Sequence, residues 1–303
     1  MAKVEKTCEF QKAIPSMGSF FEVQLPGLCN SEMNEDLTIK IKNRLDSIES
    51  EMSLYQSQSA ISRLNRTGSV DDVSLDFIRN IEFSIEHQRK TAGYFNIAIL
   101  PILQEIQTSF KETNRPPKDL SRFKSLLDLK KIKIENRKVS FAKSNMKVTL
   151  DGIAKGYAVD LIAEYIESQN VKNYLLNFSG NMRWRGRRVD GEFWRIAIWD
   201  FLNQKKIDLP AMDRGAIASS GAEYNFISED RRWHHIINPK TYRPPVHILV
   251  AAAIGPSAAI CDILSTTLFI WPDKQRRKIL PSEYPEYKYW VMESDGRIES
   301  TIL

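Results

Sequence analysis

Two oxygen-bearing side chains near the C-terminus have the spacing of a cation site. Asp262 and Thr266 lie four residues apart in the apolar residues 257–271, which predict a helix, so both side chains face the same side. A carboxylate and a hydroxyl are hard oxygen ligands, which suit Mg²⁺ better than softer metals. The alternative is a threonine hydrogen-bonded back to its own helix. A carboxylate in so apolar a helix needs a partner, because an unpaired buried charge is costly.

A second candidate site runs from Val148 to Asp160. A short apolar strand is predicted to enter a turn in which Gly152 and Gly156 flank Lys155, and an amphipathic helix follows. A turn that leads into a helix N-terminus is suited to bind a phosphate group. The patterns GxxxxGK[ST] and GxGxxG are absent, so neither a Walker A loop nor a dinucleotide fingerprint is predicted. The alternative, a surface lysine at a helix start, is disfavoured because cations are unfavourable there.

His235 is a candidate general base. It lies in residues 233–239, which predict a strand leading into a turn. An imidazole at such a place can take the proton of a hydroxyl nucleophile. Its neighbour His234 is expected on the opposite face of the strand, so at most one of the two faces a given site. The alternative is a histidine packed against a neighbouring side chain, and the residue type alone leaves both open.

The elements that must position these residues alternate irregularly. Helices are predicted over residues 35–52, 74–91 and 257–271, and another from the Gly152–Gly156 turn to about residue 169. Strands are predicted over 20–25, 131–134, 138–141, 174–178, 193–199, 216–220, 233–237, 248–254 and 287–292. Hairpin-like pairs of strands between helices favour an α+β architecture over a doubly wound parallel sheet. We expect an α+β fold with mixed sheets packed against helices. Residues 1–303 are expected to form one domain, or two intimately joined α+β subdomains.

Composition and charge exclude several classes of protein. Hydrophobic residues make up 42% of the chain and charged residues 27%, as in globular proteins. The net charge of +5 comes from 43 basic and 38 acidic residues spread along the chain, which does not indicate a nucleic-acid binder. Cys8, Cys29 and Cys261 form no CxxC pair and no metal spacing, and Cys261 is expected to be a buried thiol.

No segment has the length of a membrane span, and the N-terminus as given carries no apolar leader. A cytoplasmic location is therefore expected. A leader that has been removed would instead place the protein in the periplasm or at a membrane anchor.

Taken in order, these segments resemble the FAD:protein FMN transferase family, the ApbE-type flavin transferases. The resemblance rests on Met17-Gly-Ser19, Met52-Ser-Leu-Tyr55, Gly93-Tyr-Phe-Asn-Ile97 with Pro101, Gly152-Ile-Ala-Lys-Gly156 with Asp160, Ser179-Gly180, Ala218-Ser-Ser-Gly221, His235-Ile-Ile-Asn-Pro239 with Thr241 and Pro244, and Asp262-Ile-Leu-Ser-Thr266. These landmarks span roughly residues 15–270. Their combination and order are far more specific than any one of them.

The resemblance implies an ApbE-like flavin transferase fold and a flavin-transfer reaction. FMN would be moved from FAD, with Mg²⁺, to a Thr or Ser hydroxyl in a flavinylation-type motif of an acceptor protein, and AMP would be released. Asp262, Thr266 and the main-chain carbonyl of Gly152 would hold the metal, and His235 would be the base. The residues that would line the flavin nucleotide are Met17, Tyr55, Asn96, Ile97, Ala98, Thr149, Lys155 and Ile237.

The chain departs from this family at a few positions. The family commonly has aspartate at the positions of Asn96, Thr149, Asn181 and Asn238, and glycine at that of Tyr242. Asparagine keeps the shape of aspartate without its charge, so position 238 would not support His235 electrostatically. Asp151 is expected on the same strand face as residue 149 and can supply the charge absent there. Two alternative functions stay open: an FAD pyrophosphatase that forms FMN and AMP, and a flavin-binding protein with impaired catalysis.

Overall fold

The largest sheet joins the two ends of the chain. The computed structural model describes residues 8–28, 30–221 and 225–302. The strands of this sheet are β1 (Glu9–Ser16), β2 (Ser19–Pro26), β6 (Tyr174–Phe178), β7 (Asn181–Arg185), β10 (Arg214–Gly221), β11 (Ile248–Gly255), β12 (Lys288–Glu293) and β13 (Ile298–Ser300). Among the described residues they pair antiparallel in the order β1-β2-β6-β7-β10-β11-β12-β13.

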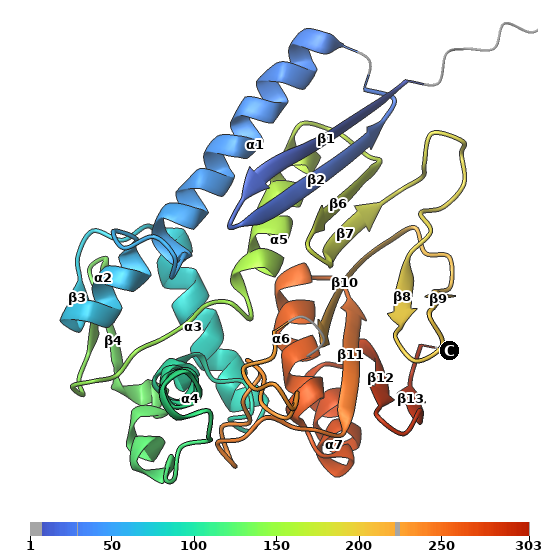
Figure 1. Ribbon diagram of the computed structural model, residues 1–303. Coiled ribbons are helices and arrows are strands. Elements are labelled where there is room, and N and C mark those ends of the chain that lie inside the picture. The colour runs from blue at the N-terminus through green and yellow to red at the C-terminus, as the bar shows by residue number, and fades with distance from the viewer. Residues whose placement is uncertain (1–7, 29, 222–224, 303) are drawn as a thin grey trace, which may run out of the picture.

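Helices cover one face of this sheet and a small hairpin covers the other (Figure 1). Helix α1 (Ser31–Met52) contacts β1, helix α5 (Ala154–Ser168) contacts β6 and β7, and helix α6 (Ala258–Ile270) contacts β10 and β11. The main hydrophobic core lies between these helices and the sheet. On the opposite face, the hairpin of β8 (Ala197–Asp200) and β9 (Lys205–Asp208) closes a second apolar cluster that contains Trp184 and Trp290.

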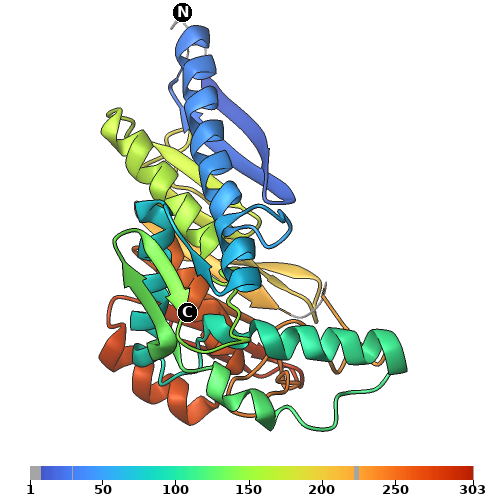
Figure 2. The same ribbon diagram turned by 90° about the vertical axis from the view of Figure 1, so that its left-hand side faces the viewer.

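The remaining elements form a lobe beside the sheet. They are α2 (Ala60–Thr67), α3 (Leu75–Lys90), α4 (Leu100–Thr113), α7 (Asp273–Glu283), the 3₁₀ helices η1 (Ile97–Ile99), η2 (Ser121–Leu126) and η3 (Leu129–Lys131), and the small sheet of β3 (Ser69–Val70), β5 (Lys138–Phe141) and β4 (Ile132–Glu135). Figure 2 shows α4, in green, projecting to one side below the long blue helix α1. A third apolar cluster packs α4 against residues 227–242.

Several turns meet at one end of the large sheet. The register pairs Phe21 of β2 with Phe178 of β6, so the turn after β1 lies next to the turn after β6. The hydroxyls of Ser19 and Ser179 are accordingly 2.5 Å apart. Strand β10 ends at the same end, because Ile217 pairs with Met182 near the start of β7. Helix α6 runs along the sheet towards this end.

The α+β prediction is confirmed, and most predicted elements appear. Three strand predictions need correction. The strand expected before Gly152 is absent, residues 193–196 precede β8 instead of extending it, and residues 233–237 make only an isolated bridge at His234. The expected burial of Cys261 is confirmed at 0% exposed. Cys29, and the residues 1–7 in which no leader is predicted, lie outside the described residues.

Candidate active site

The carboxylate of Asp262 lies buried near the start of α6, against α5. Its Oδ2 atom accepts a hydrogen bond of 3.2 Å from the main-chain N–H of Gly156. Asp262 is only 7% exposed, and burial raises its pKa to about 7. The positive charge of Lys155 opposes this rise, and the negative charge of Asp151 adds to it. Because a nearby cation stabilises a buried carboxylate, the position suits a metal ligand.

The hydroxyl of Thr266, one helical turn after Asp262, does not bond back to its own helix. Helical threonines commonly donate to the carbonyl four residues earlier, as Thr267 does at 2.6 Å. The Thr266 Oγ1 atom instead lies 3.3 Å from the hydroxyl of Ser220 on β10. The carbonyl of Asp262 accepts the hydroxyl of Ser265 at 3.0 Å. The alternative of a back-bonded Thr266 is therefore wrong.

Gly152 lies beside Thr266, in the turn that leads into α5. A Cβ atom placed on Gly152 would be 3.6 Å from Thr266 Oγ1 and 3.3 Å from the ring of Phe95. The main chain at Gly152 therefore approaches the Thr266 hydroxyl closely. The Thr266 hydroxyl and the main chain at Gly152 therefore lie side by side, one helical turn from the carboxylate of Asp262.

The segment before this turn is held by a side chain and not by a neighbouring strand. Asn65 binds both main-chain groups of Val148, with its Nδ2 atom 2.8 Å from the carbonyl and its Oδ1 atom 2.7 Å from the N–H. The N–H of Thr149 donates to the carbonyl of Ile97 at 2.8 Å. The N–H of Asp151 donates to Thr149 Oγ1 at 3.2 Å. The strand predicted here is wrong, and so is the argument that Thr149 and Asp151 share a strand face.

Lys155 lies close enough to both Asp262 and His235 for its charge to act on them, and it thereby links His235 to this group. Burial lowers the pKa of His235, and the positive charge of Lys155 lowers it further. The ring is therefore uncharged at neutral pH, and its Nδ1 atom is buried without a hydrogen-bond partner among the described residues. An uncharged imidazole can accept a proton, as a general base must. We call the five residues Gly152, Lys155, His235, Asp262 and Thr266 the α6 site.

The neighbouring histidine has a structural role. The Nε2 atom of His234 lies 2.8 Å from the carbonyl of Pro245, and its ring packs edge-on against Phe269 of α6. An isolated bridge pairs it with Phe226. Residues 233–237 therefore do not alternate as a strand, and His234 instead anchors the segment that carries His235 to α6.

Two asparagines stand where the resemblance expects aspartates, and each supports a local turn. Asn96 Oδ1 accepts the main-chain N–H two residues later at 2.9 Å, and its Nδ2 atom donates to the carbonyl of Leu127 at 2.9 Å. Asn238 Oδ1 accepts the N–H of Lys240 at 2.8 Å, within its own turn. An aspartate could accept these N–H groups but could not donate to Leu127. Asn96 therefore makes a contact that requires an amide.

Asn181 and Tyr242 are two further departures from the family pattern, and their surroundings differ. The Nδ2 atom of Asn181 lies 3.4 Å from the carbonyl of Phe178, while its Oδ1 atom is buried without a partner among the described residues. Tyr242 has a φ of 59°, in the left-handed region that favours glycine. Its ring packs against the apolar cluster of α4. This packing offsets part of the backbone strain of about 1–2 kcal/mol at that position.

The residues expected at the flavin differ in accessibility. Tyr55, just after α1, is 92% exposed. Met17 forms the turn after β1 with a φ of 47°, and its N–H donates to Glu49 Oε2 on α1 at 2.8 Å. Ile237 is buried in the apolar cluster of α4, and Ile97 and Ala98 are buried in the main core. At these three buried positions, the main chain is the group that can face a ligand.

Asp160 is a structural residue whose role the sequence alone did not reveal. Its carboxylate on α5 accepts four hydrogen bonds: from Ser257 Oγ at 2.7 Å, the N–H of Ala258 at 3.0 Å, the N–H of Ala259 at 2.9 Å and Arg183 Nη1 at 2.8 Å. It thereby satisfies N–H groups in the first turn of α6, where such groups lack partners within the helix. The sequence marked Asp160 only as a landmark of the family resemblance, without indicating what it contacts.

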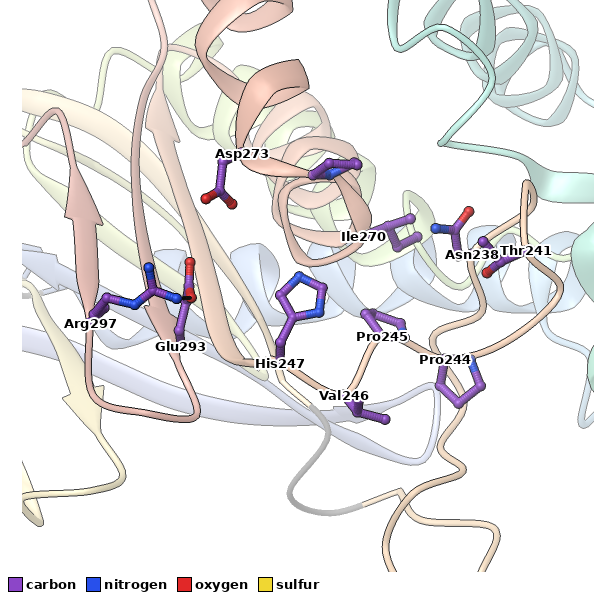
Figure 3. A pocket seen from close by; sticks show the side chains of 11 residues that line it. Asn238, Thr241, Pro244, Pro245, Val246, His247, Ile270, Asp273, Glu293 and Arg297 are labelled. Atoms are coloured by element: carbon purple, nitrogen blue, oxygen red, sulfur yellow. Dashed lines mark hydrogen bonds and ion pairs between the residues drawn. The ribbon is translucent and has the colours of Figure 1, made fainter.

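A pocket of about 660 Å³ opens beyond the α6 site. Figure 3 shows Asn238 and Thr241 on one side of it, Glu293 and Arg297 on the other, and Ile270 between them. Ile270 follows Thr266 by one turn on the same face of α6. Pocket and α6 site therefore lie along one helix face. The other lining residues are Pro244, Pro245, Val246, His247, Pro272 and Asp273.

Across the described ranges, the helices are too short or too polar to cross a membrane.

Comparisons with known proteins identify the family of this chain. The ApbE family model matches residues 17–290. A curated protein of Vibrio cholerae, named FAD:protein FMN transferase, is 28% identical over 296 residues, which cover 93% of this chain and 87% of that protein. One of Haemophilus influenzae with the same name is 29% identical over 248 residues, covering 76% and 71%.

Solved structures show the same fold. The flavin transferase ApbE of Vibrio cholerae superposes with a TM-score of 0.81 at 24% identity, covering 97% of both chains. The ApbE protein of Thermotoga maritima superposes with a TM-score of 0.84 at 20% identity, covering 97% of both chains. The range matched by the family model includes all five residues of the α6 site. The chain therefore belongs to the ApbE family.

Proposed function

We propose that this protein is an Mg²⁺-dependent FAD:protein FMN transferase. The observation that carries the proposal is the convergence of the α6 site in a chain of the ApbE family. A buried carboxylate, a hydroxyl turned off its helix, a main-chain turn, a lysine and an uncharged histidine come together there. The names of the curated relatives support the same activity.

The residues of the site fit a magnesium ion. Asp262, Thr266 and the carbonyl of Gly152 would supply hard oxygen ligands, which Mg²⁺ prefers. Among the described residues no three acidic, histidine or cysteine side chains cluster for a metal, so further coordination would come from phosphate oxygens and water. Burial raises the pKa of Asp262 even though Lys155 lies near it, and a bound cation would stabilise the charged form of this carboxylate further. A bound Mg²⁺ would neutralise pyrophosphate charge and help fix the geometry of the displacement.

The chain's own residues supply the proton transfer. His235 would take the proton from a Thr or Ser hydroxyl of the acceptor protein, for which an uncharged ring is required. The acceptor oxygen would then form a bond to the FMN phosphorus as the bond from that phosphorus to the bridging oxygen breaks. AMP would leave with the bridging oxygen. Lys155 would offset the negative charge of the phosphates.

The exposed end of the sheet would hold the flavin. Tyr55 offers an aromatic face that is almost wholly free, suited to stacking on a flavin ring. Met17 would contact the same ligand from the turn after β1. The main chain of residues 96–98, and Thr149, lie next to the Gly152 turn and would approach the nucleotide.

The test uses purified protein, FAD, Mg²⁺ and an acceptor peptide with a flavinylation-type threonine motif. We expect covalent flavin fluorescence on the peptide and an equal amount of AMP. AMP without labelled peptide would indicate a pyrophosphatase, and bound FAD without turnover an impaired flavin-binding protein. Absence of FAD binding would refute the proposal. Asp262→Asn should abolish the labelling that Mg²⁺ supports. Asp36→Asn, which changes an exposed acid on α1, should leave that labelling unchanged.

A further inference from the structure

We infer that Ser220 and Ser265 are positioning residues that hold the Thr266 hydroxyl towards the metal. The inference rests on the proposed function, because it concerns a ligand of the proposed magnesium ion. It goes beyond the ligands themselves, since neither serine is among them. Its basis is a chain of hydroxyl contacts that crosses from β10 to α6.

Ser265 blocks the contact that Thr266 would otherwise make. A threonine in a helix can bond its Oγ1 atom to the carbonyl four residues earlier. For Thr266 that carbonyl belongs to Asp262, and the Ser265 hydroxyl occupies it at 3.0 Å. Thr267, whose corresponding carbonyl has no such competitor, is bonded back at 2.6 Å. Helix α6 thus contains one threonine, Thr267, whose hydroxyl is bonded back to the helix, and next to it one, Thr266, whose hydroxyl contacts another element.

Ser220 provides the alternative contact. Its Oγ atom lies 2.8 Å from Ser265 Oγ and 3.3 Å from Thr266 Oγ1. Each hydroxyl has a single proton to donate. The Asp262 carbonyl can only accept, so Ser265 donates to it. Ser265 must then accept from Ser220, and Ser220 in turn must accept from Thr266.

This order of donors has a consequence for the metal. The Thr266 proton points at Ser220, so the lone pairs of its oxygen stay available on the other side. That orientation is the one a cation ligand needs, because a hydroxyl binds a cation through its lone pairs. Ser265 is 0% exposed, so water does not compete for the contacts of its hydroxyl, whereas Ser220 and Thr266 are half-buried. The carbonyl of Asp262 thus sets the direction of the Thr266 hydroxyl through two serines.

The test measures metal binding directly, with Mn²⁺ as a spectroscopic probe for Mg²⁺. Paramagnetic resonance gives the Mn²⁺ dissociation constant of the FAD-bound protein, and Mg²⁺ competition gives that of Mg²⁺. Ser265→Ala frees the Asp262 carbonyl for Thr266, and Ser220→Ala removes the acceptor of its proton. We expect each to weaken metal binding about ten- to a hundred-fold, as loss of supporting contacts around a metal does. FAD affinity without metal should stay unchanged.

A double-mutant comparison separates positioning from general damage. On a Thr266→Val background, Ser265→Ala should cause no further loss of metal affinity, because its effect acts through the Thr266 hydroxyl. Thr267→Val is the matched control, since it removes a back-bonded hydroxyl from the same helix and should leave metal affinity unchanged. If Ser265→Ala does not fold, Ser220→Ala carries the same test.

Three contrary outcomes can be told apart. Wild-type metal affinity in both serine variants would overturn the positioning role and leave the proposed function intact. Equal losses from Ser265→Ala with and without Thr266 would also overturn it. Absence of Mn²⁺ binding by the wild type would overturn the metal site itself, and with it this inference.

Discussion

Replacing Asp160 by alanine should destabilise the protein strongly, because this carboxylate joins α5 to the start of α6. The side chains of Arg183 and Asp160 are 20% and 12% exposed, so they form a largely buried pair. Removing one partner of such a pair costs about 3–5 kcal/mol, because the other charge stays buried alone. The Ser257 hydroxyl and two N–H groups of α6 would lose their acceptor as well. We therefore expect a loss near the upper end, about 5 kcal/mol.

Urea unfolding, followed by tryptophan fluorescence, gives the free energy of unfolding. The matched control is Asp36→Ala on α1, whose acid pairs with Lys40 while 60% exposed. That variant should change stability by less than about 0.5 kcal/mol, as exposed ion pairs contribute little. Arg183→Met added to Asp160→Ala should restore part of the loss, since it removes the unpaired charge. A loss below about 1 kcal/mol for Asp160→Ala alone would refute this reasoning.

Three further predictions concern other parts of the molecule. Gly156→Ala should lower the free energy of unfolding by about 1–3 kcal/mol, because its Cβ would lie 2.4 Å from the carbonyl of Ala258; a higher melting temperature would contradict this. Burial lowers the pKa of His87 in the folded protein to about 4. As the pH drops, the unfolded chain therefore binds a proton at this histidine at a higher pH than the folded protein does. Stability should therefore decrease by about 3 kcal/mol between pH 6.5 and 4, and urea titrations of His87→Phe should show a smaller decrease. Glu49→Ala removes the acceptor of the Met17 N–H and should weaken FAD binding about tenfold, measured by fluorescence titration, with kcat little changed; unchanged affinity would exclude a role for this turn.

Regular segments with clear periodicity could be predicted from the sequence. Strand β6 has the ends expected for it, and α6 lies within the predicted residues 257–271. Ser74, the first residue of the predicted helix 74–91, caps α3 with its hydroxyl, which accepts the N–H of Phe77. These elements have strong apolar patterns and local caps, so tertiary contacts reinforce what the sequence already favours.

Other elements could not be predicted because proline or polarity masks their pattern. Strand β1 contains Pro15, helix α4 has Pro101 as its second residue, and α7 is polar with Pro281 inside it. The segment at Val148 was apolar enough for a strand, yet its main chain is bound by Asn65 of α2, a helix far away in the sequence. A contact between residues so far apart in the sequence leaves no local signal.

The residue types of the candidate site could be predicted, but not their supporting contacts. Asp262, Thr266 and Lys155 were identified by type and spacing together with the family resemblance. The roles of Asp160, Ser220 and Ser265 depend on which elements pack together, which a single sequence does not specify. The single domain over residues 1–303 and the cytoplasmic location stay predictions.

The central claim is that the α6 site transfers FMN from FAD to a hydroxyl of a protein. Mass spectrometry of an acceptor peptide, incubated with FAD, Mg²⁺ and the protein, tests it most directly. We predict a mass increase on the motif threonine equal to FMN less one water, present with wild type and Thr267→Val and lost with His235→Ala or without Mg²⁺. An unmodified peptide in the presence of bound FAD and Mg²⁺, or labelling unaffected by His235→Ala and Asp262→Asn, would contradict the account.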